Sequence, residues 1–328
     1  MKKNIVITTI FNPTEAVLKF SRMDNYQLIV VGDKKTPADW HCQNVDYISV
    51  TEQEKSDFEL AKILPYNHYC RKMLGYLKSI QNGADYIVDT DDDNIPKDSW
   101  SFPEFENNFD CIAEHKGFIN IYQLYTKQKI WMRGLPLNLI NTQFELQKVL
   151  SEKVCKVGIW QGLADEDPDV DAIYRLTSET KCFFNERNPI VLGKGTISPF
   201  NTQNTIIKKE LFALMYLPTS VTFRFTDILR GYVAQPIMWL YDYQLGFTNA
   251  TAVHKRNSHD CMKDFLSEIP MYQHCERAIE LVSNSISGSE SIENNLYNAY
   301  KSLLKENIVC EKEMITLNAW LKEIKKLN

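Results

Sequence analysis

A run of carboxylates closes the apolar stretch YIVDTDDDNIP, residues 86–96. Asp89 is followed after one residue by Asp91, Asp92 and Asp93. Crowded carboxylates repel one another and are costly to remove from water unless a cation compensates them. Mn²⁺ and Mg²⁺ prefer hard oxygen ligands, few from the protein and others from phosphate groups. We therefore expect Asp91 and Asp93 to hold Mn²⁺ or Mg²⁺ together with a diphosphate. Asp89 is the alternative partner of Asp91, and a solvated acidic turn is the alternative to a metal site.

Strands and helices alternate ahead of this run. Apolar segments predict strands at residues 4–10, 26–33, 45–50 and 85–90, and apolar residues at helical spacing predict a helix over about 65–81. Asn12 is expected to cap a first helix, with Pro13 in the first helical position. Continuous apolar strands between helices favour a parallel sheet covered on both faces. Ligands of such sheets bind beyond the carboxyl ends of the strands, where Asp33 and the acidic run lie.

The composition is that of an ordinary globular protein. The 328 residues are 44% hydrophobic and 24% charged, with a net charge of -5, which gives no electrostatic footprint for nucleic acid. Eight cysteines without a CxxC pair indicate reduced thiols and a cytoplasmic location. The opening MKKNIVITTIFNP is expected to be a strand and not a signal peptide. No apolar run approaches the roughly 18 residues of a membrane helix, so contact with the inner membrane face would be peripheral.

The last part of the chain is expected to be a helical extension, residues 271–328, attached to a larger domain, residues 1–270. Its stripe of Leu296, Tyr300, Leu303 and Leu304 must be buried against something. Packing on its own domain is favoured over packing on a second subunit of a homo-oligomer.

Six segments, in order, resemble the STELLO-type glycosyltransferases and the related reversibly glycosylated polypeptides, which are UDP-arabinopyranose mutases. They are NHYCRKMLGYLKSIQNGADYIVDTDDDN, RGLPLN, DPDVDAIYRL, GKGTISPFNTQNT, FRFTDILRGYVAQ and HKRNSHD. The resemblance covers roughly residues 1–270 and leaves the helical extension outside. It implies an α/β fold of the GT-A (Rossmann-like) type, a nucleoside-diphosphate sugar and a divalent metal.

The resemblance also implies contacts with the sugar nucleotide. Asp33 falls where GT-A enzymes contact the base or ribose, although it could be only a strand-end turn residue. Arg71 could hold a phosphate or sugar hydroxyls through two hydrogen bonds, or form an ion pair with the aspartates, whereas Lys72 is expected at the surface. Asp92 is included in the sugar-nucleotide site. Lys255 and Arg256 would neutralise the departing diphosphate, or else form a surface pair.

Arg133 begins the RGLP segment. In the mutases the matching arginine is associated with self-glycosylation and is needed for activity, and a second arginine follows seven residues later. Ile140 occupies that second position here, which weakens the mutase interpretation. Arg133 is therefore expected to contact the donor phosphate or sugar, with a structural ion pair as the alternative.

Further candidates come from the last matching segments. Asp169 and Asp171 are expected to bind sugar hydroxyls, and a calcium loop is excluded because the EF-hand glycine and terminal glutamate are absent. Asp227, at a predicted helix start, is the candidate general base, or only a helix cap. Arg230 follows it as a sugar-nucleotide contact. His254 is expected to complete the metal shell.

These residues together predict a metal-dependent glycosyltransferase. The donor would be a UDP-sugar and the acceptor a glycan or lipid-linked glycan, in keeping with bacterial surface polysaccharide synthesis. A nucleotide-sugar mutase and a non-catalytic sugar-nucleotide binder are the alternatives.

Overall fold

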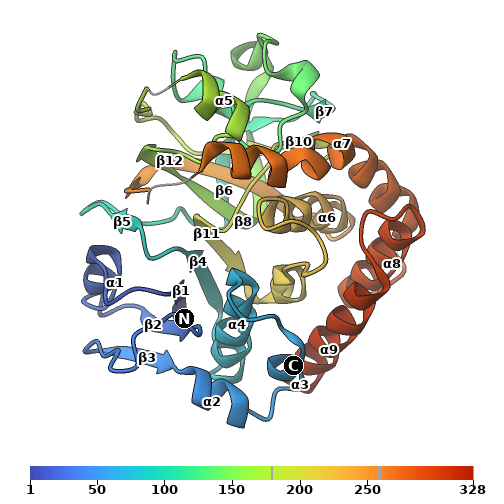
Figure 1. Cartoon of the computed structure of the whole chain (residues 1–328). Helices are drawn as coiled ribbons and strands as arrows, with labels where there is room; N and C mark the ends of the chain where they lie inside the picture. The colour runs from blue at the N-terminus through green and yellow to red at the C-terminus, as the bar shows by residue number, and fades with distance from the viewer. Residues whose placement is uncertain (179, 257–259, 328) are drawn as a thin grey trace.

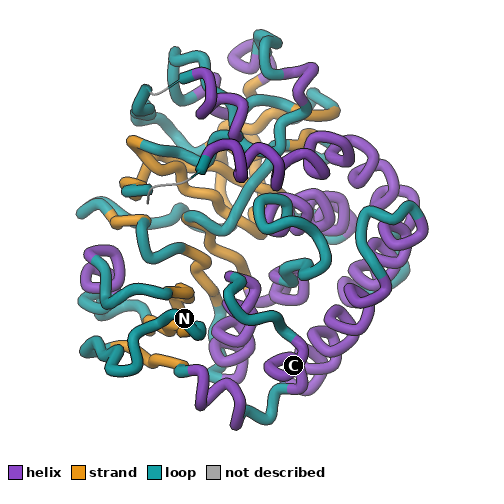
Figure 2. Tube along the Cα trace, in the orientation of Figure 1, coloured by secondary structure: helices purple, strands orange, loops and turns teal. Residues whose placement is uncertain are grey.

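The computed structural model describes residues 1–178, 180–256 and 260–327. A mixed sheet runs through the described part of the chain, with helices packed around it (Figures 1 and 2). The strand order is β3-β2-β1-β4-β11-β8-β6-β9-β12-β5, and β7 pairs separately with β10. The strands are β1 (Lys3–Thr9), β2 (Gln27–Gly32), β3 (Val45–Ile48), β4 (Tyr86–Thr90), β5 (Asn94–Pro96), β6 (Glu106–Ile112), β7 (Gly117–Phe118), β8 (Leu150–Glu166), β9 (Ile190–Leu192), β10 (Thr196–Ile197), β11 (Asn204–Lys208) and β12 (Gln244–His254).

The α-helices lie between these strands and in a C-terminal group. They are α1 (Glu15–Phe20), α2 (Val50–Lys55), α3 (Glu59–Ile63), α4 (Lys72–Gln81), α5 (Ala172–Thr177), α6 (Thr226–Leu240), α7 (Cys261–Ser285), α8 (Ile292–Lys305) and α9 (Glu311–Leu327). Short 3₁₀ helices are η1 (Tyr69–Arg71), η2 (Ile121–Leu124), η3 (Leu137–Leu139), η4 (Leu146–Val149) and η5 (Lys209–Met215).

Strands β1 to β4 form the parallel half of the sheet that the sequence predicts. β1 pairs in parallel with β2 and β4, and β2 pairs in parallel with β3. Neighbouring side chains of β1 enter different cores, because Val6 packs in one apolar cluster and Ile5 and Ile7 pack in another. Both faces of this half-sheet are therefore covered, as expected for a parallel sheet.

The first helix begins later than the sequence pattern predicts. Thr14, not Asn12, is the N-cap of α1, and its hydroxyl accepts a hydrogen bond from the Val17 backbone N–H at 3.3 Å. Pro13 therefore precedes the cap and is not the first helical residue. The same Thr14 hydroxyl donates to the Asp92 carbonyl, which ties this helix start to the acidic run.

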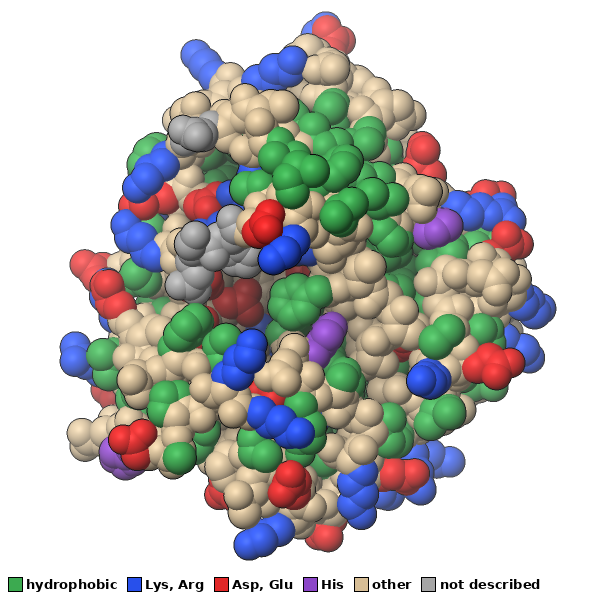
Figure 3. Space-filling model, in the orientation of Figure 1, with side chains coloured by type: hydrophobic (Ala, Val, Ile, Leu, Met, Phe, Trp, Pro, Cys, Tyr) green, Lys and Arg blue, Asp and Glu red, His purple; other side chains and the backbone are tan. Residues whose placement is uncertain are grey.

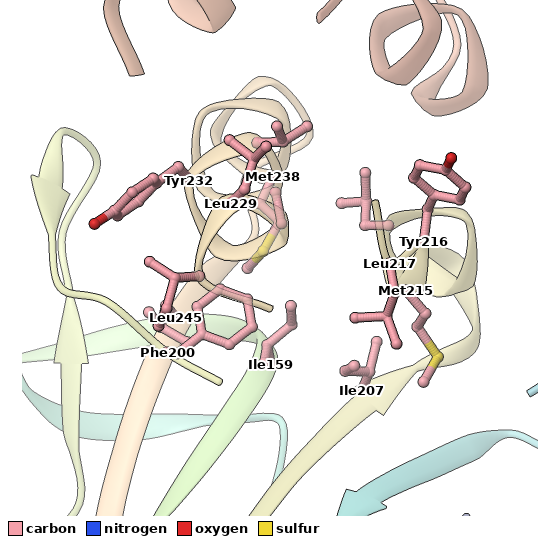
Figure 4. Packing of buried hydrophobic residues seen from close by; sticks show 14 of the residues in the cluster. Ile159, Phe200, Ile207, Met215, Tyr216, Leu217, Leu229, Tyr232, Met238 and Leu245 are labelled. Atoms are coloured by element: carbon pink, nitrogen blue, oxygen red, sulfur yellow. The ribbon is translucent and has the colours of Figure 1, made fainter. Parts of the chain in front are cut away.

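The second half of the sheet is mixed. β11 runs antiparallel between β4 and β8, and the long β8 also pairs with β6 and β12. Helix α6 packs on this half, and Figure 4 shows its Leu229 and Met238 near Ile159 of β8 and Leu245 of β12. The observed architecture is thus a mixed α/β fold with a Rossmann-like parallel half.

The C-terminal helices share the core of the preceding residues (Figure 1). Leu296, Tyr300 and Leu303 of α8 are buried, and the Tyr300 ring packs edge-on against Tyr216 with 5.2 Å between ring centroids. Trp320 of α9 donates its indole N–H to the Ala213 carbonyl at 2.9 Å. The predicted packing of the stripe on its own chain is confirmed, and these side chains are not available to a second subunit. Helix α7 also runs through residue 270 without interruption, so the expected boundary falls inside one helix.

Two general expectations can be compared with the fold. The eight cysteines are free, and six of them are buried. Within the described ranges, no helix combines the length and the apolar character needed to cross a bilayer.

Candidate functional site

A cleft of about 220 Å³ opens beyond the carboxyl end of β4. Figure 3 shows acidic side chains at the bottom of a hollow in this face of the molecule. The predicted residues that line the cleft are Asp91, Asp92, Asp93, Arg133, Asp169, Asp227, His254 and Arg256. The fold therefore brings residues from most of the matching segments into one site.

Lys72 occupies the middle of the acidic run, contrary to the expectation that it lies at the surface. Its side chain is fully buried, and its ammonium lies 3.0 Å from Asp89 and 2.6 Å from Asp91. Burial alone would lower the pKa of Lys72, but the two carboxylates outweigh burial and raise it to about 12. Part of the positive charge that the acidic run requires is thus supplied by the protein itself.

Arg71, the residue predicted for this role, points elsewhere. Its guanidinium donates to the Gln53 side chain and to the Leu64 carbonyl, and it stacks on Tyr66. Because successive residues of a helix point about 100° apart, only one of Arg71 and Lys72 can face β4 at the start of α4. Arg71 is buried outside the cleft and is a structural residue here.

Asp93 and His254 are neighbours because β5 pairs antiparallel with β12, with Asn94 opposite His254. The His254 Nε2 atom lies 3.2 Å from the Asp93 carboxylate, and Nδ1 contacts the Asp167 carbonyl at 2.5 Å. Burial opposes protonation of His254, but the contacts with Asp93 and Asp167 outweigh it and raise the pKa of the imidazole. The carbonyl contact orients the ring so that Nε2 points at Asp93, as the outer partner of a metal-binding histidine does.

These residues fit a divalent cation only in part. Among the described residues, no group of three or more histidine, cysteine, aspartate or glutamate side chains is placed to hold a metal ion. Asp93 and His254 offer two ligands, and Asp91 is already paired with Lys72. Two protein ligands suffice for a cation whose other ligands are phosphate oxygens and water.

Asp91 and Asp92 lie in an environment that disfavours their charge. Loss of surrounding water raises the pKa of Asp91 to about 7, although Lys72 opposes this. Burial likewise raises the pKa of Asp92 to about 6, and its carboxylate accepts a hydrogen bond from the Thr9 hydroxyl. Further positive charge near these carboxylates would therefore be favourable.

Arg133 is held between two aspartates on the other side of the cleft. It donates to both carboxylate oxygens of Asp169, at 2.9 and 2.6 Å, and to both oxygens of Asp227, each at 2.9 Å. It also donates to the Arg224 carbonyl. Each N–H group of the guanidinium therefore has an acceptor within the protein. The structural ion pair left open by the sequence is present, and in this conformation Arg133 has no donor left for a phosphate.

The backbone conformation and the packing at position 134 explain why a glycine follows Arg133. Gly134 has a φ of +95°, and a Cβ atom there would lie 2.6 Å from Ile228 and 2.7 Å from the Tyr232 hydroxyl of α6. A glycine is needed both for the backbone conformation and for this close approach. The turn at Gly134 places Arg133 against the first turn of α6, where Asp227 lies.

Asp227 is not the N-cap of α6, a position that Phe225 holds. Its carboxylate accepts from Arg133, from the Tyr69 hydroxyl at 3.3 Å and from its neighbour's backbone N–H. Asp169 accepts from Arg133 and from Asn201. Burial would raise the pKa of Asp169, but Arg133 and then Arg224 hold it well below its usual range.

The remaining predicted residues lie outside the cleft lining. Asp33 accepts from the backbone N–H groups of Lys34 and His68. Asp171 caps α5, and its oxygens accept from the Tyr174 N–H and the Trp131 indole. In this structure both carboxylates accept hydrogen bonds from donors within the protein.

Two predicted cations also lie outside the cleft lining. Arg230 is buried under the cleft and donates to Asp89 at 2.7 Å and to the Asn201 carbonyl. Lys255 pairs with Glu166 at 2.7 Å in an exposed position. Both are held by ion pairs within the chain in this structure.

Several residues that line the cleft were not singled out from the sequence, although each lies in a matching segment. They are Arg175, Asn201, Thr202, Gln203, Phe223 and Arg224, together with Tyr69. Arg175, Arg224 and Arg256 line the same cleft, and burial followed by the positive charges of the other two arginines lowers the pKa of Arg256. Residues 257–259 of the HKRNSHD segment lie outside the described residues.

Comparison with known proteins identifies relatives. The sequence model described as STELLO glycosyltransferases matches residues 224–328. "Probable glycosyltransferase STELLO2" of Arabidopsis thaliana is 27% identical over 259 residues, covering 73% of this chain and 34% of that protein. "Probable glycosyltransferase STELLO1" of the same plant is 26% identical over 348 residues, covering 98% and 44%. These matches confirm the resemblance to STELLO-type glycosyltransferases.

The extent of the matches differs from the expectation in one respect. The family match includes the C-terminal helices, so the prediction that the helical extension lies outside the resemblance is wrong. The chain spans between about a third and a half of the length of these curated relatives. A solved structure named "Crystal Structure of a Mycobacterial Protein" aligns with 87% of this chain and 76% of its own, at a TM-score of 0.38 and 11% identity.

Proposed function

We propose that this chain, which is similar to the STELLO glycosyltransferases, transfers a sugar from a nucleoside-diphosphate sugar to an acceptor hydroxyl. The observation that carries the proposal is the single cleft beyond β4 that collects Asp93, His254, Arg133, Asp169 and Asp227 from distant segments. A cleft lined by both carboxylates and guanidinium groups suits a substrate that carries both a sugar and a diphosphate.

The finer features of the proposal rest on the resemblance. We assign the sheet to the GT-A type, with a UDP-sugar as donor and a glycan or lipid-linked glycan as acceptor, in bacterial surface polysaccharide synthesis. The parallel order β3-β2-β1-β4, with the acidic run directly after β4, supports the GT-A assignment of the sheet.

Asp93 and His254 would hold Mn²⁺ or Mg²⁺ in this site. The bound cation would supply positive charge to the diphosphate as it leaves. Asp227 is the proposed base for the acceptor hydroxyl, and it must exchange one of its present hydrogen bonds for that hydroxyl. Arg133 positions Asp227 and Asp169 through its ion pairs, and, against the effect of burial, it holds the pKa of Asp169 well below its usual range.

The mutase alternative loses support from Arg133. The N–H groups of Arg133 are all engaged within the protein, by Asp169, Asp227 and the Arg224 carbonyl, and Ile140 stands at the position of the second arginine of the mutases. The non-catalytic alternative keeps one supporting observation, because Asp227 and Asp169 are both engaged by Arg133.

The metal site is tested by titrating UDP into the protein with Mn²⁺ and with EDTA. Asp93→Asn and His254→Ala should abolish the Mn²⁺-dependent part of the binding, whereas Asp98→Asn, an exposed acid nearby, should leave it unchanged. Metal-independent binding that is identical in all variants would contradict the assigned site.

Asp227→Asn separates transfer from binding. Loss of a general base typically lowers the rate by roughly 100- to 10,000-fold, while the donor dissociation constant should stay within a few-fold. Transfer that survives within a few-fold, or donor binding that collapses with it, would show that Asp227 is not the base. Ring-contracted sugar nucleotide formed without any acceptor would support the mutase instead.

A further inference from the structure

Three arginines form one wall of the cleft and come from separate elements. Arg175 lies on α5, Arg224 lies just before α6, and Arg256 lies after β12. Their side chains are nearly buried, with 12%, 14% and 10% exposure respectively. Placing three permanent positive charges on one desolvated wall is unfavourable unless negative charge faces them.

Carboxylates of the protein compensate the positive charge of these three arginines. Arg175 donates to Asp167, Arg224 to Glu268 and Arg256 to Asp264. Each guanidinium is thereby fixed at one side by a carboxylate. Because a guanidinium has donors on several sides, this arrangement leaves other N–H groups for a ligand in the cleft.

Two buried donor atoms of these three arginines have no hydrogen-bond acceptor among the described residues. They are Arg175 Nε and Arg224 Nη2. Arg224 Nη2 lies 2.8 Å from a Glu268 oxygen but is not aligned for a hydrogen bond, and the next carboxylate, Asp169, is 3.8 Å away. A buried donor without an acceptor is costly, so a ligand oxygen that reached these atoms would be favourable.

Arg133, on the same cleft, does not share this property. All of its donors are used by Asp169, Asp227 and the Arg224 carbonyl. The capacity to bind an added anion therefore belongs to Arg175, Arg224 and Arg256 and not to Arg133; of these three, only Arg256 was suggested by the sequence.

Helix α7 determines the position of this wall through Glu268, which is fully buried. One Glu268 oxygen accepts from Arg224, and the other accepts from the Ala172 backbone N–H at the start of α5 and from the Tyr272 hydroxyl. Glu268 thus connects Arg224 to the helix that carries Arg175. The C-terminal helices therefore take part in building the site.

We propose that Arg175, Arg224 and Arg256 form a phosphate subsite that binds the diphosphate oxygens of the sugar donor, with Glu268 as a positioning residue. The identity of the ligand, a sugar-donor diphosphate, rests on the proposed function. Asp91, Asp92 and Asp93 line the same cleft. A diphosphate bound with a cation has complementary charges for both groups of side chains, because its oxygens match the guanidinium groups and its cation matches the carboxylates.

The subsite acts on the leaving group in transfer. The acceptor oxygen forms a bond to the sugar carbon and gives its proton to a base. The bond between that carbon and the phosphate oxygen breaks, and its electron pair remains on the phosphate. Guanidinium N–H groups that bind the diphosphate stabilise the negative charge added to it.

The experiment uses the whole chain and two probes, inorganic pyrophosphate and UDP, in calorimetric titrations with and without Mn²⁺. Arg224→Gln and Arg175→Gln should each weaken pyrophosphate binding at least tenfold. Arg224→Lys, which keeps the charge beside Glu268, should fall between wild type and Arg224→Gln. Arg277→Gln is the matched control, because Arg277 is an exposed, ion-paired arginine of α7. Circular dichroism and thermal unfolding verify the fold of each variant.

The outcomes separate the subsite from the proposed function. Pyrophosphate binding that weakens in Arg224→Gln and Arg175→Gln but not in Arg277→Gln supports the subsite. Pyrophosphate and UDP affinities in both subsite variants that equal those of Arg277→Gln would overturn it and leave the proposed function standing. Arginine-dependent pyrophosphate binding in a wild-type chain that does not bind UDP would support the subsite and count against the UDP-sugar donor.

Discussion

Replacing Lys72 with methionine should both destabilise the chain and improve its affinity for Mn²⁺. The ammonium is fully buried between Asp89 and Asp91, at 3.0 and 2.6 Å. Methionine has a similar length and removes the charge without opening a large cavity. The main effect is therefore electrostatic, because a buried carboxylate loses its cation.

The expected loss of unfolding free energy depends on how well Asp89 and Asp91 are still compensated after the substitution. Removing one partner of a buried ion pair costs about 3–5 kcal/mol. Asp89 would keep Arg230 at 2.7 Å, and the Asp91 side chain is 36% exposed, so both are partly compensated. We expect a loss of about 3 kcal/mol in the free energy of unfolding, at the lower end of that range.

The same change should alter metal binding, because Asp91 is released from Lys72 and becomes a third ligand beside the Asp93 carboxylate and the His254 imidazole. A tenfold tighter dissociation constant would add about 1.4 kcal/mol to the stabilisation by saturating Mn²⁺. The assay is urea unfolding with and without Mn²⁺, together with calorimetric titration of the metal. Lys255→Met, which removes an exposed ion pair with Glu166, is the control and should cost less than about 1 kcal/mol.

A double variant identifies the cause. Lys72→Met with Asp91→Asn should be less destabilised than the sum of the two single variants, since the orphaned charge is removed with its cation. If Lys72→Met stays within about 0.5 kcal/mol of wild type and its Mn²⁺ affinity is unchanged, Lys72 does not act as the counter-ion of the acidic run.

Three further perturbations test the structure around the cleft. His68 accepts the Cys70 N–H through Nδ1, and burial lowers its pKa to about 4, so the unfolded chain binds the proton more readily. Relative to His68→Asn, wild type should lose on the order of 3 kcal/mol of unfolding free energy as the pH falls from about 6.5 to about 4, and equal slopes in urea unfolding would contradict this. Trp320→Ala should cost about 3–5 kcal/mol, because the indole is fully buried in the shared core; a chain of unchanged heat stability would show that α9 contributes little. Gly134→Ala should destabilise the chain by about 2 kcal/mol or more and weaken donor binding, whereas Gly288→Ala, which meets no atoms, should be tolerated; equal effects in thermal unfolding would refute the packing argument.

Much of the parallel half of the fold could be predicted from local patterns. Buried strands such as β1 and β2 are continuous apolar segments, and the break after each strand is marked by polar or turn residues. The packing of the α8 stripe was also predictable, because a helix with one apolar face must bury it. Precise starts were less predictable, as Thr14 shows, since competing cap residues stand side by side.

The sequence by itself determined which segments are candidates to line a site, because the acidic run, RGLP and the segment around Asp227 are recognisable from residue type and order, and these segments meet at one cleft. Only the tertiary structure decided which charges meet. Strand pairing brings His254 to Asp93, a rotation of about 100° puts Lys72 and not Arg71 on the acids, and α7 places Glu268 behind Arg224. Charge pairing depends on distances of a few ångströms between residues far apart in the chain. The residue type determines what a side chain can bind. Only the packing of the chain determines whether that side chain is already bound by a partner within the protein.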